Sequence, residues 1–144
     1  MTDTAEFELS HFLPYLLNQA AESSSRDFQK LYKDRYGMLR TEWRVLFHLG
    51  RHGAMTAKDI CDRAMIHKTK VSRAVRALQD KRFLQRKTLE HDRRNEALSL
   101  TVKGTKVFED LTSEAAAYDE RISGLFKAEE REVLLACLLK IAKV

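Results

Sequence analysis

Apolar residues recur at intervals of three and four along most of this 144-residue chain, a spacing that places them on one face of an α-helix. The pattern predicts a first long helix from about Leu13 to Arg35, with Pro14 in its first turn, where a missing N–H costs no hydrogen bond. It predicts a second helix that begins after Thr41, as N-cap, and ends at Gly50 or Gly53.

The middle of the chain predicts two short helices in tandem and then a β-hairpin. Thr56–Asp59 resembles a capping box, with Asp in place of the usual Glu, and opens the first short helix. After the brief turn Met65–Ile66, the second spans His67–Lys81. Helical periodicity is then lost, and two short strands are expected near Phe83–Lys87 and Glu96–Leu100, with the polar turn Glu90–Asn95 between them.

Two further helices are expected at the carboxyl end. Thr101 caps the first of them, whose apolar positions form a heptad-like seam: Phe108, Leu111, Ala115, Tyr118, Ile122 and Leu125. The last helix, Glu129–Lys143, is apolar nearly all round and must be buried on most sides. The chain has too few other elements to cover it, so a second copy is the simplest partner.

Composition favours a globular protein, because 44% of the residues are hydrophobic and 33% are charged. No run approaches the roughly 20 apolar residues of a membrane span, and the acidic segment Met1–Glu8 does not resemble a signal peptide. We therefore expect a cytoplasmic protein, with no membrane partner. Cys61 and Cys137 are far apart and belong to no CxxC motif, so neither a structural disulfide nor a zinc site, nor any cofactor, is expected.

Charge is distributed unevenly. The segment from Arg51 to Lys103 has fourteen Lys or Arg residues against six Asp or Glu, a net charge of +8 in a chain whose total is +5. A basic unit flanked by mildly acidic helices is typical of polyanion binding, and duplex DNA is the favoured partner.

The predicted helix His67–Lys81 has the chemistry needed to read DNA. If its apolar stripe faces the core, the opposite face and its flank present Lys68, Thr69, Ser72, Arg73 and Arg76. Arginine can contact guanine with two hydrogen bonds, and hydroxyls can contact phosphates or base edges. Taken alone, the helix fits a solvated basic surface better. The preceding short helix and tight turn and the following basic hairpin shift the preference to DNA binding.

The hairpin turn adds a second candidate contact. Asp92 can accept hydrogen bonds from turn N–H groups or from Arg94 and so hold the loop in shape. Arg93 and Arg94 would then project from a narrow tip that fits a minor groove. The alternative is an ordinary charged loop.

Four segments resemble the MarR (multiple-antibiotic-resistance regulator) family, and the resemblance extends from about residue 10 to the end. They are Trp43–Leu46, Val71–Val75 with Leu78, Asp92–Arg94 and Leu100–Gly104. The resemblance implies a mainly α fold with a small β-hairpin wing, the winged helix-turn-helix. It also implies that the protein is a homodimeric repressor controlled by a small effector. Its parts would be an N-terminal dimerisation helix in residues 1–40, the DNA-binding region in 41–103 and C-terminal dimerisation helices in 104–144, intertwined as one domain.

By motif position, Ser72 and Arg73 match the family's recognition-helix pair, and Asp92 and Arg94 match its wing pair. His67 stands where an acidic residue is common, so base preference can differ. The oxidation-sensing branch has a reactive Cys in the first helix, which this chain lacks. Cys61 on an inward helix face and Cys137 in the apolar last helix would be poor thiolates, so thiol sensing is not expected.

The resemblance also implies an effector cleft, often for small aromatic acids, between the dimer helices and the winged region. The residues that could line it are His11, Tyr15, Asn18, Trp43 and Arg44. Arg44 could bind a carboxylate and Trp43 could stack on a ring, although Trp43 can equally be core and Arg44 a solvated charge.

His48 and His52 are four residues apart, a possible metal pair. No third ligand is evident in the sequence, so surface histidines are the preferred interpretation.

With this resemblance, the expected protein is a bacterial or archaeal sequence-specific regulator that binds a near-palindromic duplex with half-sites about one helical turn apart. It would associate with the nucleoid when bound to DNA. A non-specific DNA-organising protein remains the alternative. The sequence contains no Gly-rich phosphate loop, HExxH or GxSxG motif, so an enzyme is not expected. RNA binding is less favoured, because no aromatic platform accompanies the basic residues.

Overall fold

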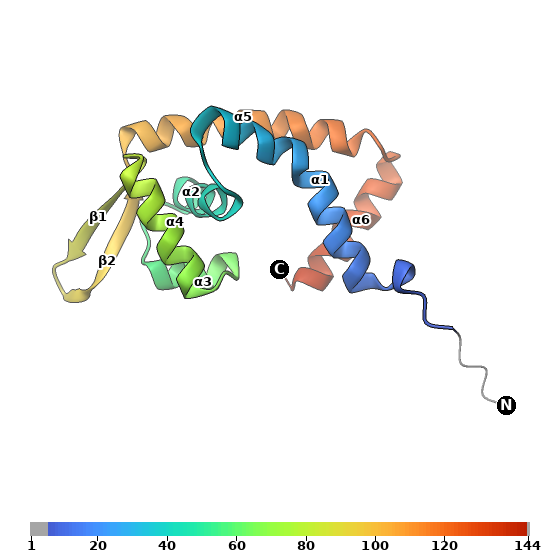
Figure 1. Cartoon of the computed structure of the whole chain (residues 1–144), viewed down its shortest axis with the longest axis horizontal. Helices are drawn as coiled ribbons and strands as arrows, with labels where there is room; N and C mark the ends of the chain where they lie inside the picture. The colour runs from blue at the N-terminus through green and yellow to red at the C-terminus, as the bar shows by residue number, and fades with distance from the viewer. Residues whose placement is uncertain (1–5, 144) are drawn as a thin grey trace.

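The structure is a computed structural model that describes residues 6–143, apart from the side chain of Arg93. Its elements confirm a mainly helical fold with one antiparallel hairpin (Figure 1). A 3₁₀ turn, η1 (Leu9–His11), precedes six helices and two strands: α1 (Leu13–Tyr36), α2 (Arg40–His52), α3 (Ala57–Ala64), α4 (Lys68–Asp80), β1 (Leu84–Leu89), β2 (Asp92–Leu100), α5 (Val102–Ser123) and α6 (Ala128–Ala142).

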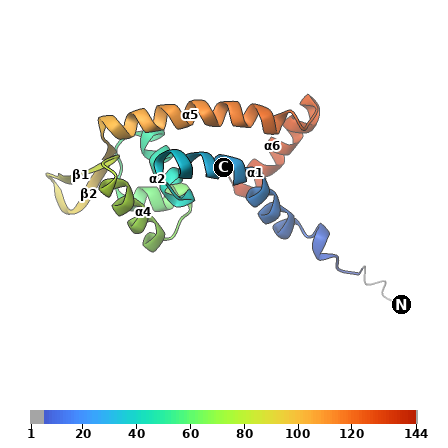
Figure 2. The same ribbon diagram turned by 45° about the horizontal axis from the view of Figure 1, so that its top comes forward.

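Helix α5 connects the two ends of the molecule. In Figures 1 and 2 it runs along the top, with α2, α3, α4 and the hairpin at one end and α6 with the first turns of α1 at the other. The buried apolar side chains of the described chain all lie between Phe28 and Leu111, so the core sits in the end that carries the hairpin.

Hydrogen bonds at the helix starts explain where the elements of this end begin. Thr56 and Asp59 form the predicted capping box of α3 with two reciprocal bonds of 3.2 Å, and Thr101 caps α5 by accepting the Gly104 N–H at 3.0 Å. His67 is the N-cap of α4, since its Nδ1 accepts the Thr69 N–H at 3.2 Å.

The predicted N-cap of the second helix is wrong. Thr41 already lies in the first turn of α2, which begins at Arg40 with Leu39 as the capping residue. The carboxylate of Glu42 accepts the Leu39 N–H at 3.2 Å and also binds Lys81 Nζ at 3.1 Å. This buried carboxylate therefore replaces the hydroxyl cap and ties the start of α2 to the end of α4.

The hairpin is longer than predicted. Pairing runs from Leu84 opposite Leu100 to Thr88 opposite Glu96, and after a bulge Leu89 lies opposite Asp92. The turn is therefore narrower than the predicted Glu90–Asn95, because β2 continues through Asn95 to Asp92.

Helix α5 begins in very close contact with the hairpin base. A Cβ at Gly104 would lie 1.9 Å from the carbonyl oxygen of Phe83, so only glycine fits there. Thr101 Oγ1 adds a 2.6 Å bond to the carbonyl of Arg82. These contacts fix the hairpin to the first turn of α5.

Helix α6 has no buried residue, although it is the most apolar segment of the described chain. Its large apolar side chains are exposed: Val133, Leu134, Leu135, Leu138, Leu139 and Ile141. Of the predicted α5 seam, Leu111 is buried, Leu125 lies beyond the helix end and is exposed, and the others are half-buried. One chain therefore does not cover these surfaces. No helix of the described residues is long and apolar enough to span a membrane.

Candidate nucleic-acid interface and effector pocket

Helix α4 presents one buried and one basic face. Its inward residues Val71, Ala74, Val75 and Leu78 are buried against the core. The predicted DNA-contacting residues of this helix are all exposed: Lys68, Thr69, Ser72, Arg73 and Arg76. The geometry leaves these side chains available to a ligand, and DNA contact by them stays a prediction.

The wing turn is shaped by Asp92, as its sequence indicated. One carboxylate oxygen accepts the Arg94 N–H at 3.1 Å, and the other accepts Asn95 Nδ2 at 2.8 Å. The Arg94 side chain is exposed, whereas that of Arg93 lies outside the described structure. Asp92 is thus a positioning residue that sets the turn beside Arg94.

A groove of about 670 Å³ brings the two predicted sets together, because Lys68 and Ser72 of α4 and Arg94 of β2 all line it. Sequence reasoning missed five other polar residues on its walls: Thr56, Lys58, Arg86, Asn95 and Glu96. Arg86 joins the hairpin to α4, since it donates to Gln79 Oε1 at 2.9 Å and lies 3.4 Å from a Glu96 oxygen. For Lys58 and Arg86 the sequence signal was the local excess of basic side chains.

The two cysteines are free and occupy different surroundings. Cys61 is half-buried and lines the same groove. Cys137 is exposed on α6, so the expectation that its apolar helix shields it is wrong for a single chain. The reason is that none of the elements in residues 6–143 buries that face of α6.

A second cavity, of about 490 Å³, lies between α1, α2 and α5, and we call it the inter-helix pocket. Trp43 and Arg44 line it, as the effector prediction requires. Its other lining residues are Ser24, Phe28, Phe47, His48, Ala115, Tyr118, Asp119 and Ile122. His11, Tyr15 and Asn18 do not line it in this chain, because the first turns of α1 extend away from α2 (Figure 1).

Trp43 and Arg44 each line the pocket and also contact another part of the chain. The Trp43 ring packs edge-on against Phe28 with centroids 5.2 Å apart, so it is both half-buried core and pocket wall. Arg44 Nη2 donates to the carbonyl oxygen of Ala64 at 2.6 Å. Arg44 is exposed, as the alternative interpretation assumed, and its guanidinium has a backbone partner as well.

His48 lines the same pocket with an unused hydrogen-bonding atom. Its Nδ1 is buried and has no partner, and its ring stacks on that of His52 with centroids 5.9 Å apart. Burial lowers the pKa of His48, and the nearby charges of His52, Arg44 and Arg63 lower it further. No group of three or more metal-ligating side chains occurs among the described residues, so the structure adds no third ligand to this pair.

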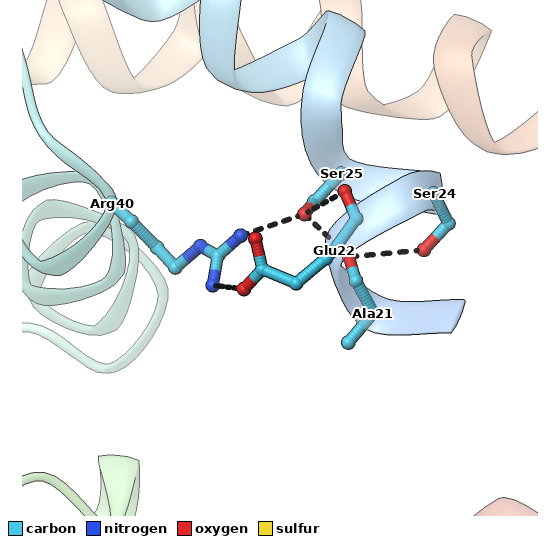
Figure 3. A network of polar contacts seen from close by, with 5 residues as sticks. All are labelled: Ala21, Glu22, Ser24, Ser25 and Arg40. Atoms are coloured by element: carbon cyan, nitrogen blue, oxygen red, sulfur yellow. Dashed lines mark hydrogen bonds and ion pairs between the residues drawn. The ribbon is translucent and has the colours of Figure 1, made fainter. Parts of the chain in front are cut away.

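Polar contacts hold α1 against the pocket. Figure 3 shows Arg40, at the start of α2, bound to Glu22 at 2.9 Å and to Ser25 Oγ at 2.9 Å. Hydrogen bonding to Arg40 lowers the pKa of the Glu22 carboxyl. On the other side, the Tyr118 hydroxyl of α5 donates to the carbonyl of Ser24. These contacts join α1 to α2 and to α5, the three helices that line the pocket.

Comparison with known proteins agrees with this architecture. A model of the MarR family matches residues 36–95. The transcriptional regulator YwoH of Bacillus subtilis is 25% identical over 126 residues, covering 86% of this chain and 91% of YwoH.

Two solved structures share the fold. BpsR of Bordetella bronchiseptica superposes with a TM-score of 0.87 at 21% identity over 97% of this chain and 99% of BpsR. S. aureus MepR, in a complex with DNA, superposes with a TM-score of 0.83 at 22% identity over 92% of this chain and 96% of MepR. The tandem helices α3 and α4 and the braced wing lie largely within the matched segment, so this part of the chain is similar to the MarR family of transcriptional regulators.

Proposed function

We propose that the protein is a homodimeric, sequence-specific repressor that binds a near-palindromic operator and is released by a small aromatic acid. The observation that carries the proposal is the single groove on which the basic face of α4 meets Arg94 of the wing. The segment Arg51–Lys103, which supplies every residue lining this groove, has a net charge of +8 that favours phosphate contacts. Helix α4 has the length and exposed face of a major-groove reader.

The DNA contacts divide by chemistry. Ser72 and Arg73, near the middle of the exposed face, read base edges, while Lys68, Thr69 and Arg76 contact phosphates. Arg93 and Arg94 enter the minor groove, and Asp92 holds their turn. MepR, which has the same fold, has been captured on DNA, and this supports the assignment.

The dimer uses the helices that one chain leaves uncovered. Apolar side chains of α6 are exposed together with Phe12, Leu13 and Leu16 of the N-terminal region. An exposed set of this size marks an interaction surface, and a two-fold dimer satisfies it without a further partner. Residues 1–40 and 104–144 would then clamp two winged regions at a fixed spacing.

The effector site is the inter-helix pocket. Arg44 and His48 are one turn apart on α2, which sets their Cβ atoms about 5–6 Å from each other. An aromatic acid could place its carboxylate at Arg44 and its ring near Trp43, beside His48 on the same wall. DNA binding by BpsR is regulated by 6-hydroxynicotinic acid, a compound of this class.

The test of the DNA-binding role is Arg73→Ala, with Lys106→Ala on α5 as a matched loss of one exposed cation. Duplexes selected from a random pool by the wild-type protein supply the operator for mobility-shift titrations. We expect Arg73→Ala to abolish specific binding and leave the dimer intact, and Lys106→Ala to bind as the wild type does. Unchanged operator affinity in Arg73→Ala would overturn the motif assignment.

The same titration, repeated in excess genomic DNA, separates a repressor from a non-specific DNA-organising protein. A repressor keeps its selected site under competition, whereas an organising protein is titrated away.

A further inference from the structure

Arg44 joins two regions that the sequence gives no reason to connect. Its side chain lines the inter-helix pocket, and its Nη2 donates at 2.6 Å to the carbonyl of Ala64, the last residue of α3. The pocket is the proposed effector site, while Ala64 stands directly before the turn into α4. One side chain therefore touches both the candidate sensor and the DNA-reading unit.

The turn after Ala64, residues 65–67, determines the angle between α3 and α4. Met65 adopts a left-handed conformation, with φ of 55°, and its side chain is 79% exposed. Such a conformation is disfavoured for a residue with a side chain and persists only where its surroundings hold it. The N–H groups of Met65 and Ile66 both donate to the carbonyl oxygen of Cys61. The Arg44 side chain adds a hydrogen bond to the carbonyl of Ala64 from outside the helix.

The other charged groups of the pocket leave Arg44 open to a new anion. Asp119 is the acidic side chain on the described pocket wall, and it is already paired with Arg131 Nη2 at 3.2 Å. A neutral carbonyl is a weaker acceptor for a guanidinium than a carboxylate, because the second bond is charge-assisted and can be bidentate. A carboxylate entering the pocket would compete for the atoms that now hold Ala64.

We propose that Arg44 is the switch between the effector pocket and the α3–α4 turn, exchanging the Ala64 carbonyl for the carboxylate of a bound aromatic acid. This inference rests on the proposed function. In the ligand-free state Arg44 holds the turn and α4 keeps the angle that DNA requires. In the bound state the turn loses its anchor, α4 samples other angles and operator affinity falls.

The experiment combines operator affinity with amide hydrogen exchange at residues 64–67 of the full-length dimer. It compares the wild type with Arg44→Gln, which keeps the length and polarity of the side chain but loses the charge. The probe is 6-hydroxynicotinic acid, and its uncharged amide is the control ligand. Arg63→Gln removes the same charge on the same side of the turn and is the control for exchange.

In the wild type we expect the acid to accelerate exchange at residues 64–67 and to lower operator affinity, and the amide to do neither. Arg44→Gln should show fast exchange and an affinity lower by on the order of tenfold with no ligand present, as loss of a hydrogen bond from a charged donor implies. Adding the acid to Arg44→Gln should then change its operator affinity little further. Arg63→Gln should exchange as the wild type does.

Three results would overturn the switch. Wild-type exchange and affinity in ligand-free Arg44→Gln would make Arg44 a ligand-binding residue only. Release of Arg44→Gln from DNA by the acid, to the wild-type extent, would make it a structural anchor only. If the acid left hydrogen exchange at residues 64–67 of the wild type unchanged, Arg44 would not release the Ala64 carbonyl when the acid binds. Failure of the proposed function is distinct, because it would appear as undiminished operator binding by Arg73→Ala.

Discussion

Both ends of this molecule contain many apolar side chains, but only one end buries them within the chain. From α2 to the first half of α5, inward-facing residues such as Val45, Leu46, Val71 and Leu78 are almost completely buried within one chain. In α6, which is richer in leucine, every large apolar side chain remains exposed. Hydrophobic patterning therefore identifies surfaces that must be covered, and the tertiary structure shows which of them the chain covers alone.

Under the proposed function, the two ends have distinct tasks. The winged end has a closed core, in which Glu42 with Lys81 ties the start of α2 to the end of α4 and Arg86 with Gln79 joins the wing to α4. The other end has an apolar surface that the described residues of one chain leave exposed. If the proposed function is correct, DNA binding depends on packing within one chain, whereas the spacing of the two DNA-binding units depends on a second chain.

The largest expected effect comes from breaking the uncovered end. Leu135 and Leu139 lie one turn apart on α6, and the double change Leu135→Glu with Leu139→Glu alters four side chains in a dimer. Burial of a leucine contributes about 1.5–3 kcal/mol, so the dimer should lose about 6 kcal/mol or more of association free energy. Sedimentation analysis should show a folded monomer.

Circular dichroism of this variant should retain the signal of the winged end, and operator affinity should fall because bivalent binding is lost. Lys140→Ala, on the same helix, is the control and should stay dimeric. A double-Glu variant that remains a dimer at micromolar concentration would show that α6 is not the association surface.

A smaller effect is expected inside the closed core. Leu46 is fully buried, and Leu46→Ala should lower the free energy of unfolding by about 3 kcal/mol, the sum of lost burial and a residual cavity. Val102→Ala, at a side chain that is 78% exposed, should change it by no more than about 0.5 kcal/mol. Urea titrations measure both, and equal effects of the two changes would contradict the assignment of the core.

The periodic features of this fold could be predicted from the sequence. The spacing of apolar residues located every long helix, and the Thr56–Asp59 and Thr101 caps appear as expected, because both signals depend on residues within one or two turns. The N-cap of α2 was mislocated for the same reason. Thr41 is the better local cap, but Glu42 is held by Lys81, 39 residues away, and its carboxylate caps the helix instead.

The candidate sites show the same limit. The exposed face of α4 follows from the helical period, so its residues were identifiable. The Arg44 bond to the Ala64 carbonyl was not, because a backbone acceptor 20 residues away leaves no trace in side-chain chemistry. His11, Tyr15 and Asn18 were placed with Trp43 by resemblance, but the direction of α1 depends on tertiary contacts such as Arg40 with Glu22.

The smallest effect concerns His48, in the pocket between the two ends. Burial lowers its pKa, so the unfolded chain binds a proton at a higher pH than the folded chain does. The stability that the neutral ring contributes is present above the ordinary histidine value of about 6.5 and is lost as pH falls below it. Because the ring is half-exposed and screened, we expect a loss well below 1 kcal/mol between pH 7.5 and 5.5.

His48→Leu should remove this part of the pH dependence without lowering stability at pH 7.5, because it also removes the buried, unpartnered Nδ1. His91→Gln, at the exposed wing tip, should keep the wild-type profile. Urea titrations at several pH values measure the difference, and parallel profiles for the wild type and His48→Leu would contradict it. A flatter profile confined to His48→Leu would show that the pocket, and not the histidines in general, makes the junction of the two ends sensitive to protons.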